Sequence, residues 1–270
     1  MDDLTQGFLF GNPDVVGDDV ARVELRLAAL NIQSPSTNRA RDVLDWLYRS
    51  QSNVLVLTEV KAGEAADLIL KDLESSGFTI TRRPAGPDDK YLTVIATKGY
   101  RTAALPLAMD STRFVGARLA THFGDFDVLG LYALTNGMTE ESSRNRKAFQ
   151  EQVLDALRAR IAAQPEVPLL ITGDFNVLEP DRDPPASRAL FADHDYAFYR
   201  SLADLGLIDT YRQIHPEGAD LTWYGPQGGQ RLDHIFISPA AFTRVRAVGF
   251  QHDVRTAKIS DHSALVAALI

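Results

Sequence analysis

Two short strings in the second half of the chain carry residues that are suited to chemistry on a phosphate ester. Residues 169–176 read Leu-Leu-Ile-Thr-Gly-Asp-Phe-Asn, and residues 259–262 read Ile-Ser-Asp-His. In each string an apolar, strand-like run meets a carboxylate and a second polar group at its edge. A fold that unites Asp174, Asn176 and His262 would combine a water activator, an orienting amide and an imidazole facing a phosphate. This combination indicates metal-assisted cleavage of a phosphate ester.

Polar side chains also stand at the edges of three other strand-like runs, namely Asn31, Glu59 and Asp233. Carboxylates at strand ends are costly unless they are paired, hydrated or bound to a cation. Several of them at one end of a sheet therefore imply a cation there. The chain has no cysteine, so its metal ligands must be oxygen atoms or imidazoles, which suits magnesium, manganese or calcium.

The composition is that of an ordinary globular protein of 270 residues, long enough to bury one large core. The first residues are acidic and no apolar run approaches the ~20 residues that span a bilayer, so we expect a soluble, cytoplasmic protein. The net charge of -8 opposes tight binding to a duplex and favours a small phosphoester substrate, although a local basic rim is compatible with it.

Apolar periodicity predicts the elements that position these groups. Residues 1–21 lack a pattern and are expected to be an irregular leader, followed by one domain over 22–270. Strands are expected at 23–32, 53–58, 78–83, 91–97, 114–121, 125–132, 231–238 and 263–269. Helices are expected at 63–75, 141–163, 187–192 and 196–205. A further helix is capped by Thr37 or Asn38, and its inward face is Ala40, Val43, Leu44, Leu47 and Tyr48. Strands and helices alternate in the first part of the chain, and strands dominate the later part. This order favours a mixed α/β domain.

Five motifs occur in an order and spacing that resemble the endonuclease/exonuclease/phosphatase superfamily. They are Leu30-Asn31, Leu57-Thr-Glu59, Gly173-Asp-Phe-Asn176, Arg231-Leu-Asp-His234 and Ser260-Asp-His262. The resemblance covers about residues 22–270. Between 206 and 233, the segments Gly206–Pro216, Leu221-Thr-Trp-Tyr224 and Arg231-Leu-Asp233 are similar to the exonuclease III branch, which includes abasic-site endonucleases.

The resemblance implies an α+β fold of the DNase I type, a four-layer α/β sandwich in which two central mixed sheets are flanked by helices. It also implies a Mg²⁺ or Mn²⁺ cofactor. Glu59 corresponds to the principal metal carboxylate, with Asn31 beside it, and Asp261 would complete the metal shell or the network around it.

The same resemblance assigns the catalytic roles. Asp174 would activate the attacking water, and Asn176 would hold that water and a phosphate oxygen. His262 would donate to the scissile phosphate and Asp233 would orient its imidazole. Tyr132 stands where the family has a tyrosine that contacts the phosphate. In isolation, each of these residues also has a structural interpretation, such as an ion pair between Asp233 and Arg231.

Three further residues are candidates for substrate binding: Asn136, Arg144 and Trp223. Trp223 follows the threonine of the exonuclease III-like motif, where an aromatic lies near the cleft, but packing is an alternative role. Arg144, with Arg146 and Lys147, would rim the cleft with positive charge, or would form a solvated helix face. Asn136 follows Tyr132 one position later than the amide of that branch.

The function that best fits these residues is a metal-dependent nuclease or phosphodiesterase acting on nucleic acid. The alternative is a phosphatase or phosphodiesterase of a nucleotide, sugar phosphate or lipid headgroup. The acidic charge and the altered segments at 31–33 and 132–136 favour this alternative. A binding protein without catalysis is the third hypothesis, and the occupied catalytic positions disfavour it.

Overall fold

The computed structural model describes residues 24–135, 137, 139–180, 182, 191–226 and 228–270. The predicted leader lies outside these residues, as does nearly all of the helix predicted at 187–192. The single domain expected over 22–270 therefore stays a proposal. Within the described ranges, none of the helices combines the length and apolar character needed to span a membrane.

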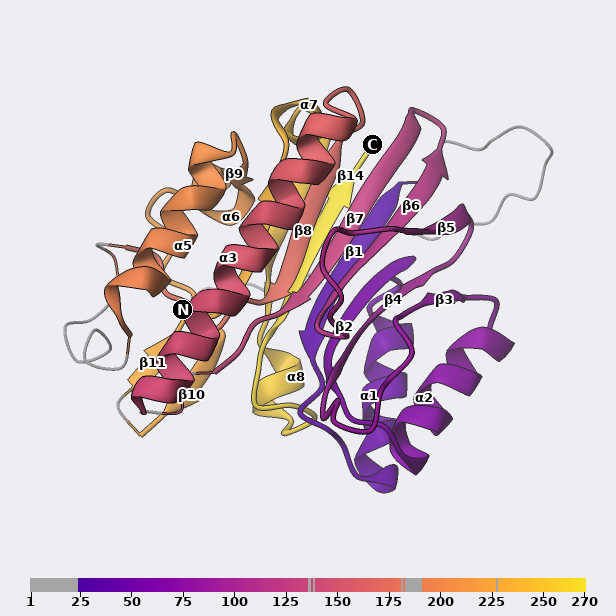
Figure 1. Cartoon of the computed structure of the whole chain (residues 1–270). Coiled ribbons are helices and arrows are strands. Elements are labelled where there is room, and N and C mark those ends of the chain that lie inside the picture. Colours follow the sequence, from indigo (N-terminus) through magenta and orange to yellow (C-terminus); the bar gives the residue numbers. More distant parts are fainter. Residues whose placement is uncertain (1–23, 136, 138, 181, 183–190, 227) are drawn as a thin grey trace, which may run out of the picture.

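Two six-stranded mixed sheets form the centre of the molecule (Figure 1). The first has the order β13 (Val245–Gln251), β14 (Ala264–Leu269), β1 (Leu25–Asn31), β2 (Val54–Val60), β4 (Leu92–Thr97) and β3 (Thr79–Thr81). The second has the order β5 (Arg101–Leu105), β6 (Phe114–Thr121), β7 (Gly124–Tyr132), β8 (Leu169–Asp174), β12 (Asp233–Ile237) and β9 (Ile208–Asp209). Only the β1–β2 pair and the β7–β8 pair are parallel among the described ladders. A separate hairpin contains β10 (Trp223–Gly225) and β11 (Gly228–Gln230).

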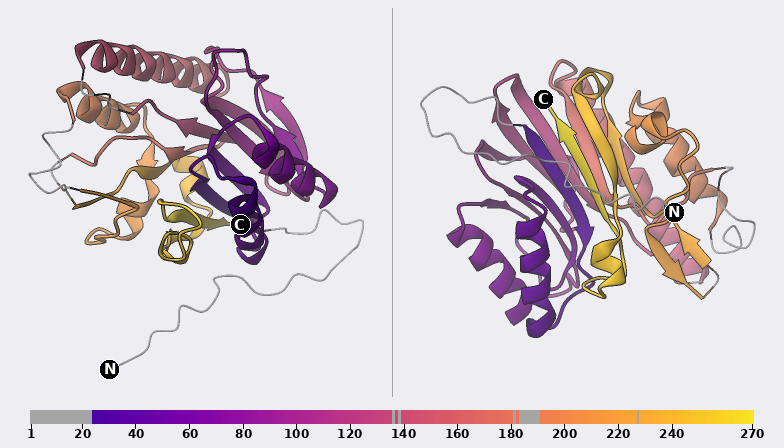
Figure 2. Two further views of the ribbon diagram at one scale, coloured as in Figure 1. Left: turned by 90° about the horizontal axis from the view of Figure 1, so that it is seen from below. Right: turned by 180° about the vertical axis from the view of Figure 1, so that it is seen from behind.

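Helices cover the outer faces of both sheets, as Figures 1 and 2 show. The first sheet carries α1 (Thr37–Arg49) and α2 (Glu64–Ser75), and the second carries α3 (Glu140–Ala163) and α5 (Asp193–Asp204). Three shorter helices complete the described fold: α6 (Thr210–Ile214), α7 (Pro239–Phe242) and α8 (Asp253–Thr256). The molecule is therefore the predicted four-layer sandwich.

Three apolar clusters separate the four layers. In β1, Leu27 and Ala29 face the cluster between the sheets, whereas Ala28 and Leu30 face α1 and α2. Successive strand residues point to opposite faces, so a strand covered on both sides must be apolar throughout. This explains why the central strands read as uninterrupted apolar runs.

The long helix and the central strands were predicted to within a few residues, but several details differ. The N-cap of α1 is Ser36, whose hydroxyl accepts from the Arg39 amide, and not Thr37 or Asn38. Tyr48 is exposed rather than inward-facing, and its hydroxyl bonds to Asp72. The predictions lacked the edge strands β5, β9 and β13, the β10–β11 hairpin and the helices α6, α7 and α8.

Candidate active site

The predicted catalytic side chains meet at one edge of the two sheets, the lower edge in Figure 1, where β1 and β8 end. Asp174 ends the central strand β8. Its register partner in β7 is Tyr132, and its partner in β12 is Asp233. Asn31 ends β1 in the facing sheet, and its amide donates to Asp174 Oδ2 at 2.9 Å. The sheets therefore place residues that are far apart in the sequence around one carboxylate.

His262 completes this group just before β14. Its Nδ1 lies 2.8 Å from Asp233 Oδ2, and its Nε2 lies 3.9 Å from Asp174 Oδ2. The Asn31 amide nitrogen lies 3.5 Å from the same Nε2. Ser260 ties the segment down, because its hydroxyl donates to the Asn31 carbonyl and accepts from the His262 amide. Asp174, Asp233 and His262 are all buried.

Burial and charge perturb the two central groups in ways that suit proton transfer. Burial raises the pKa of Asp174 to about 7, while the nearby His262 opposes that rise. Burial lowers the pKa of His262, but the carboxylates of Asp233 and Asp174 outweigh burial and raise it to about 10. Near neutral pH the imidazole is therefore a cation, and the Asp174 carboxyl is poised between its two forms.

Asn176 adopts a left-handed backbone with φ of 48° directly after this carboxylate. Its amide donates to Asp174 Oδ1 at 2.9 Å, and its side chain donates to the Ala133 carbonyl at 3.1 Å. Gly173 permits the preceding bend, since a Cβ there would lie 2.2 Å from the Leu131 carbonyl oxygen. A left-handed backbone is unfavourable for a residue other than glycine, so it persists only where surrounding contacts hold it. Such residues cluster at functional sites.

Glu59, with φ of 52°, also has a left-handed backbone at this edge, and Tyr132 donates to its Oε1 at 2.6 Å. Burial, with the carboxylates of Asp174 and Glu59, raises the pKa of Tyr132, so the phenol stays protonated as a donor. Asp261 accepts from the Trp223 indole at 3.1 Å through Oδ2. Its buried Oδ1 has no hydrogen-bond partner within the described part of the chain.

These oxygen atoms fit a hard divalent cation held by few protein ligands. Among the described residues, no three acidic or histidine side chains form a closed metal cage. Magnesium does not require such a cage, because it retains several waters and binds one or two carboxylates. The unpartnered Asp261 Oδ1 and the Glu59 carboxylate, which both border the cavity, suit such an open site. Asn31 ends the strand next to Glu59, and its Oδ1 accepts from the Gln33 amide.

A cavity of about 410 Å³ opens over these groups. Its lining contains Glu59, Thr135, Arg146, Asp174, Asn176, Phe191, Trp223, Gln230, Leu232, Asp261 and His262. The lining combines ionisable side chains such as Asp174 and His262 with an apolar group formed by Phe191, Trp223 and Leu232. Its size falls within the ~300–1,000 Å³ of small-ligand pockets. A cavity of this size is large enough for a phosphate with a small attached group.

Arg146, which the sequence offered with Arg144 and Lys147 as a basic rim of the cleft or as a solvated helix face, is buried in the cavity wall. Its guanidinium pairs with Asp195 at 2.7 Å and donates to the Asn176 carbonyl. Arg144, by contrast, is 71% exposed, pairs with Glu140 at 3.6 Å and does not line the cavity. The cation predicted near the cleft is thus Arg146 rather than Arg144. Asn136 lies outside the described residues.

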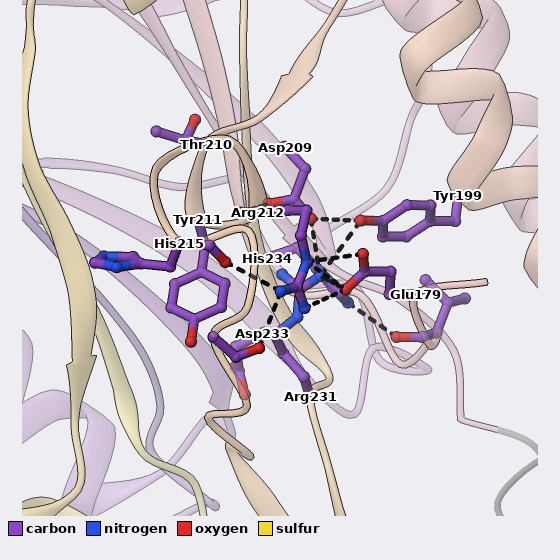
Figure 3. Close-up of polar contacts among 12 residues, drawn as sticks. Glu179, Tyr199, Asp209, Thr210, Tyr211, Arg212, His215, Arg231, Asp233 and His234 are labelled. Atoms are coloured by element: carbon purple, nitrogen blue, oxygen red, sulfur yellow. Dashed lines mark hydrogen bonds and ion pairs between the residues drawn. The ribbon is translucent and has the colours of Figure 1, made fainter. Parts of the chain in front are cut away.

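A buried polar network holds the segment that leads into Asp233 (Figure 3). Arg231 donates to Glu179 at 2.7 Å and to Asp209 at 2.9 Å, so it does not pair with Asp233 as the structural alternative required. Arg212 also bonds to Glu179 at 2.7 Å. Because Arg231 lies two residues before Asp233, these ion pairs fix the start of β12.

His234, which follows Asp233, is enclosed by the fold and does not line the cavity. It is fully buried and its Nε2 lies 2.9 Å from the Val177 carbonyl. Burial and the cation of Arg231 lower its pKa to about 4, so it is neutral near pH 7. An uncharged imidazole fits this enclosed position, where its Nε2–H donates to the carbonyl.

A sequence profile described as the Endonuclease/Exonuclease/phosphatase family matches residues 28–262. An exodeoxyribonuclease III of Haemophilus influenzae is 32% identical over 118 residues, which are 36% of this chain and 44% of that protein. An exodeoxyribonuclease of Streptococcus pneumoniae is 26% identical over 246 residues, which are 78% of this chain and 85% of that protein.

Solved structures give the same fold. The 3′ phosphatase NExo from Neisseria, bound to a product DNA hairpin, has a TM-score of 0.76 at 20% identity, covering 91% of this chain and 99% of that one. An AP endonuclease from Archaeoglobus fulgidus has a TM-score of 0.74 at 21% identity, covering 91% and 99%. At 20–21% identity, these similarities support the sandwich architecture only. The reaction has to be inferred from the residues of the site.

Proposed function

Because the chain belongs to the endonuclease/exonuclease/phosphatase family, we propose that it is a divalent-metal-dependent hydrolase that cleaves phosphodiesters in DNA. The observation that carries the proposal is the pairing of Asp174 with His262, with 3.9 Å between Oδ2 and Nε2 at the cavity. A carboxylate beside an imidazolium offers both a proton acceptor and a cation to one phosphate. The exodeoxyribonuclease names of two relatives support DNA as the substrate.

In this proposal Asp174 accepts the proton of the attacking water. Its pKa of about 7 suits a base that works near neutral pH. The Asn31 amide and the Asn176 backbone hold one carboxylate oxygen each, which fixes the direction of that proton transfer. Asn176, constrained by its hydrogen bond to Ala133, would position the water and a phosphate oxygen.

His262 would stabilise the charge that builds on the phosphate. Asp233 holds Nδ1, so Nε2 is the edge that donates to a phosphate oxygen. A donor that is fixed before the reaction does not need to reorganise as charge develops. Tyr132 is fully engaged with Glu59, so we propose that it positions the metal carboxylate rather than contacting the phosphate itself.

We propose that Glu59, Asn31 and Asp261 hold Mg²⁺ or Mn²⁺. When bound, such an ion supplies Lewis-acid polarisation of the phosphoryl oxygen. The chain's contribution is to aim these oxygen donors at the cavity, with the Trp223 indole holding one Asp261 oxygen and leaving the other free of protein partners among the described residues.

Hydrolysis of a small phosphoester is the second candidate function. The net charge of -8 and the bounded cavity of about 410 Å³ favour it. A nucleotide or sugar phosphate would use the same proton acceptor and donor, but would require no extended basic surface. This candidate predicts phosphate release from a metabolite panel without salt-sensitive binding to DNA.

The test compares the purified protein on single-stranded, nicked and abasic oligonucleotides, with Mg²⁺ and with EDTA. The proposal predicts products that require the metal and that disappear in His262→Ala. If all oligonucleotides remain intact while a small phosphoester is hydrolysed, the second candidate replaces the first. A non-catalytic binding protein would hydrolyse neither and would show no Mn²⁺ binding that Glu59→Ala removes.

A further inference from the structure

The side chain of Gln230 carries an amide that borders the catalytic cavity and that the proposed chemistry does not use. Gln230 ends β11, is 4% exposed and lines the catalytic cavity. Its backbone carbonyl accepts from the Thr222 amide at 2.8 Å. Its side-chain amide makes no hydrogen bond to another described residue, and its oxygen and nitrogen are not among the fully enclosed polar atoms without a partner, so they reach the cavity.

No described protein group engages this amide, so its hydrogen bonds are open to whatever fills the cavity. A substrate that enclosed the amide without hydrogen-bonding it would incur about 1–3 kcal/mol, because buried polar groups normally need partners. A methionine of the same length would fill this space without that cost. The position therefore fits a group whose partner arrives with the substrate.

The hairpin holds Gln230 beside an aromatic wall. Gln230 and Trp223 are register partners in the β10–β11 pair, and opposed residues of an antiparallel pair project from the same face. Trp223 is fixed by its indole hydrogen bond to Asp261. Leu232 and Phe191 add further apolar surface to the cavity lining. The amide is thus a single polar group set within an apolar wall.

This wall adjoins the phosphate-facing histidine directly. The Trp223 backbone forms a β-bridge with His262, so the hairpin and the catalytic edge are joined at that point. Figure 1 shows the β10–β11 hairpin near the lower edge of the sheets, where β8 ends. A group that rests on this wall would be the one covalently attached to the phosphate at His262.

A nucleobase matches the chemistry of this wall. Flat, apolar rings stack on aromatic side chains, and the edge of a base presents donors and acceptors next to each other. The primary amide of glutamine carries one acceptor and two donors, which can engage such an edge through two parallel hydrogen bonds. A base edge therefore satisfies the acceptor and a donor of the amide together.

We infer that Gln230 is a specificity-determining residue that hydrogen-bonds the base of the nucleotide joined to the scissile phosphate. The inference rests on the proposed function and adds to it a substrate class: a nucleotide with an intact base. A base-free sugar would not supply the two hydrogen bonds that a base edge offers this amide. Sites built to hydrogen-bond a substrate discriminate strongly against analogues that lack the matching group.

The test measures kcat/KM on oligonucleotides that differ only at the nucleotide joined to the cleaved bond. That nucleotide carries thymine, its non-hydrogen-bonding shape mimic difluorotoluene, or a tetrahydrofuran in place of the nucleoside. Wild type is expected to prefer thymine over difluorotoluene by roughly tenfold, the lower range for a two-bond contact. Gln230→Met should reduce this ratio to near one without lowering Tm.

The matched control is Gln152→Met, which makes the same replacement at an exposed position of α3 and should keep the wild-type ratio. An unchanged thymine preference in Gln230→Met would overturn the inference. A lower Tm of Gln230→Met with an equal loss of kcat/KM on all three substrates would also overturn it, because that pattern indicates a packing role for Gln230. A wild-type preference that separates tetrahydrofuran from the other two substrates, but not thymine from difluorotoluene, would mean that the wall reads shape alone and would also overturn it. If wild type hydrolyses no DNA at all with Mg²⁺, the proposed function itself has failed.

Discussion

Asp233 Oδ2 lies 2.8 Å from Nδ1 of His262, and this contact determines which edge of the imidazole faces the cavity. With Nδ1 engaged, Nε2 is the nitrogen that lies 3.9 Å from the Asp174 carboxylate. The ionised Asp233 also helps to keep the imidazole protonated, because it raises the pKa of His262. One carboxylate therefore sets both the orientation and the charge of the proposed phosphate donor.

Asp233→Asn is expected to lower kcat by at least about a hundredfold, the lower range for a positioned acid–base group. The amide keeps the shape but removes the charge that holds the imidazolium. The exposed Asp125→Asn is the control for the same chemical change. NMR titration should also show a lower His262 pKa in Asp233→Asn. Wild-type kcat in that variant would contradict the assignment.

Tyr132→Phe tests whether the phenol positions the metal carboxylate. The hydroxyl donates to Glu59 at 2.6 Å, so its removal should weaken Mn²⁺ binding by about 10–100-fold, as for other residues that orient metal ligands. Tyr91→Phe is the matched control, since Tyr91 packs edge-on against Tyr132 with ring centroids 5.6 Å apart. Unchanged Mn²⁺ affinity, measured by calorimetry, would argue against this role.

Arg146→Met and Arg144→Met separate a buried cation from an exposed one on the same helix. Removing Arg146 leaves Asp195 buried without its ion pair, so we expect a loss of about 3–5 kcal/mol in the free energy of unfolding. Arg144 is 71% exposed, and its loss should change that free energy by less than about 0.5 kcal/mol. Urea denaturation of both variants measures the difference. Equal effects would mean that the Arg146–Asp195 pair contributes no more than a surface contact.

His234 should make stability fall on acidification. The unfolded chain protonates it near its ordinary pKa of 6.5, whereas burial and Arg231 keep it neutral in the fold down to about pH 4. Between these values the unfolded state binds more protons, so each pH unit of acidification removes up to about 1.4 kcal/mol. His234→Gln, which retains a donor for Val177, should flatten this slope between pH 6.5 and 4 relative to His122→Gln. Identical slopes in urea melts would disprove the linkage.

The catalytic edge was predictable because each of its residues follows or precedes an apolar strand. Asn31 and Asp174 end strands that are buried on both faces, and a polar group at such an end has few structural reasons to be there. The β1–β2 and β7–β8 pairs are parallel, so the ends of the two strands in each pair lie at the same edge of the sheet. The β5 and β13 strands were missed because they lie at the sheet edges, where partial exposure weakens the apolar pattern.

Arg146 and Gln230 both line the cavity, and the sequence signals for these two residues differ. Arg146 carried a usable signal, because it precedes Phe149 by three residues and Val153 by seven, on the buried stripe of α3. Its burial depends on Asp195 of another helix, which no local pattern reveals. Gln230 carried no signal, because it lies in a glycine-rich stretch and acquires its position only from pairing with Trp223.

The most direct measurement is hydrolysis of a labelled oligonucleotide in Mg²⁺ by wild type and by Asp174→Asn, with the fold of both checked by thermal melting. Because the amide conserves the shape of the side chain, the account predicts near-wild-type Tm together with a loss of turnover of at least about a hundredfold. Retained turnover in Asp174→Asn, or a collapse of Tm that accounts for its loss, would contradict the claim that this carboxylate accepts the proton of the attacking water.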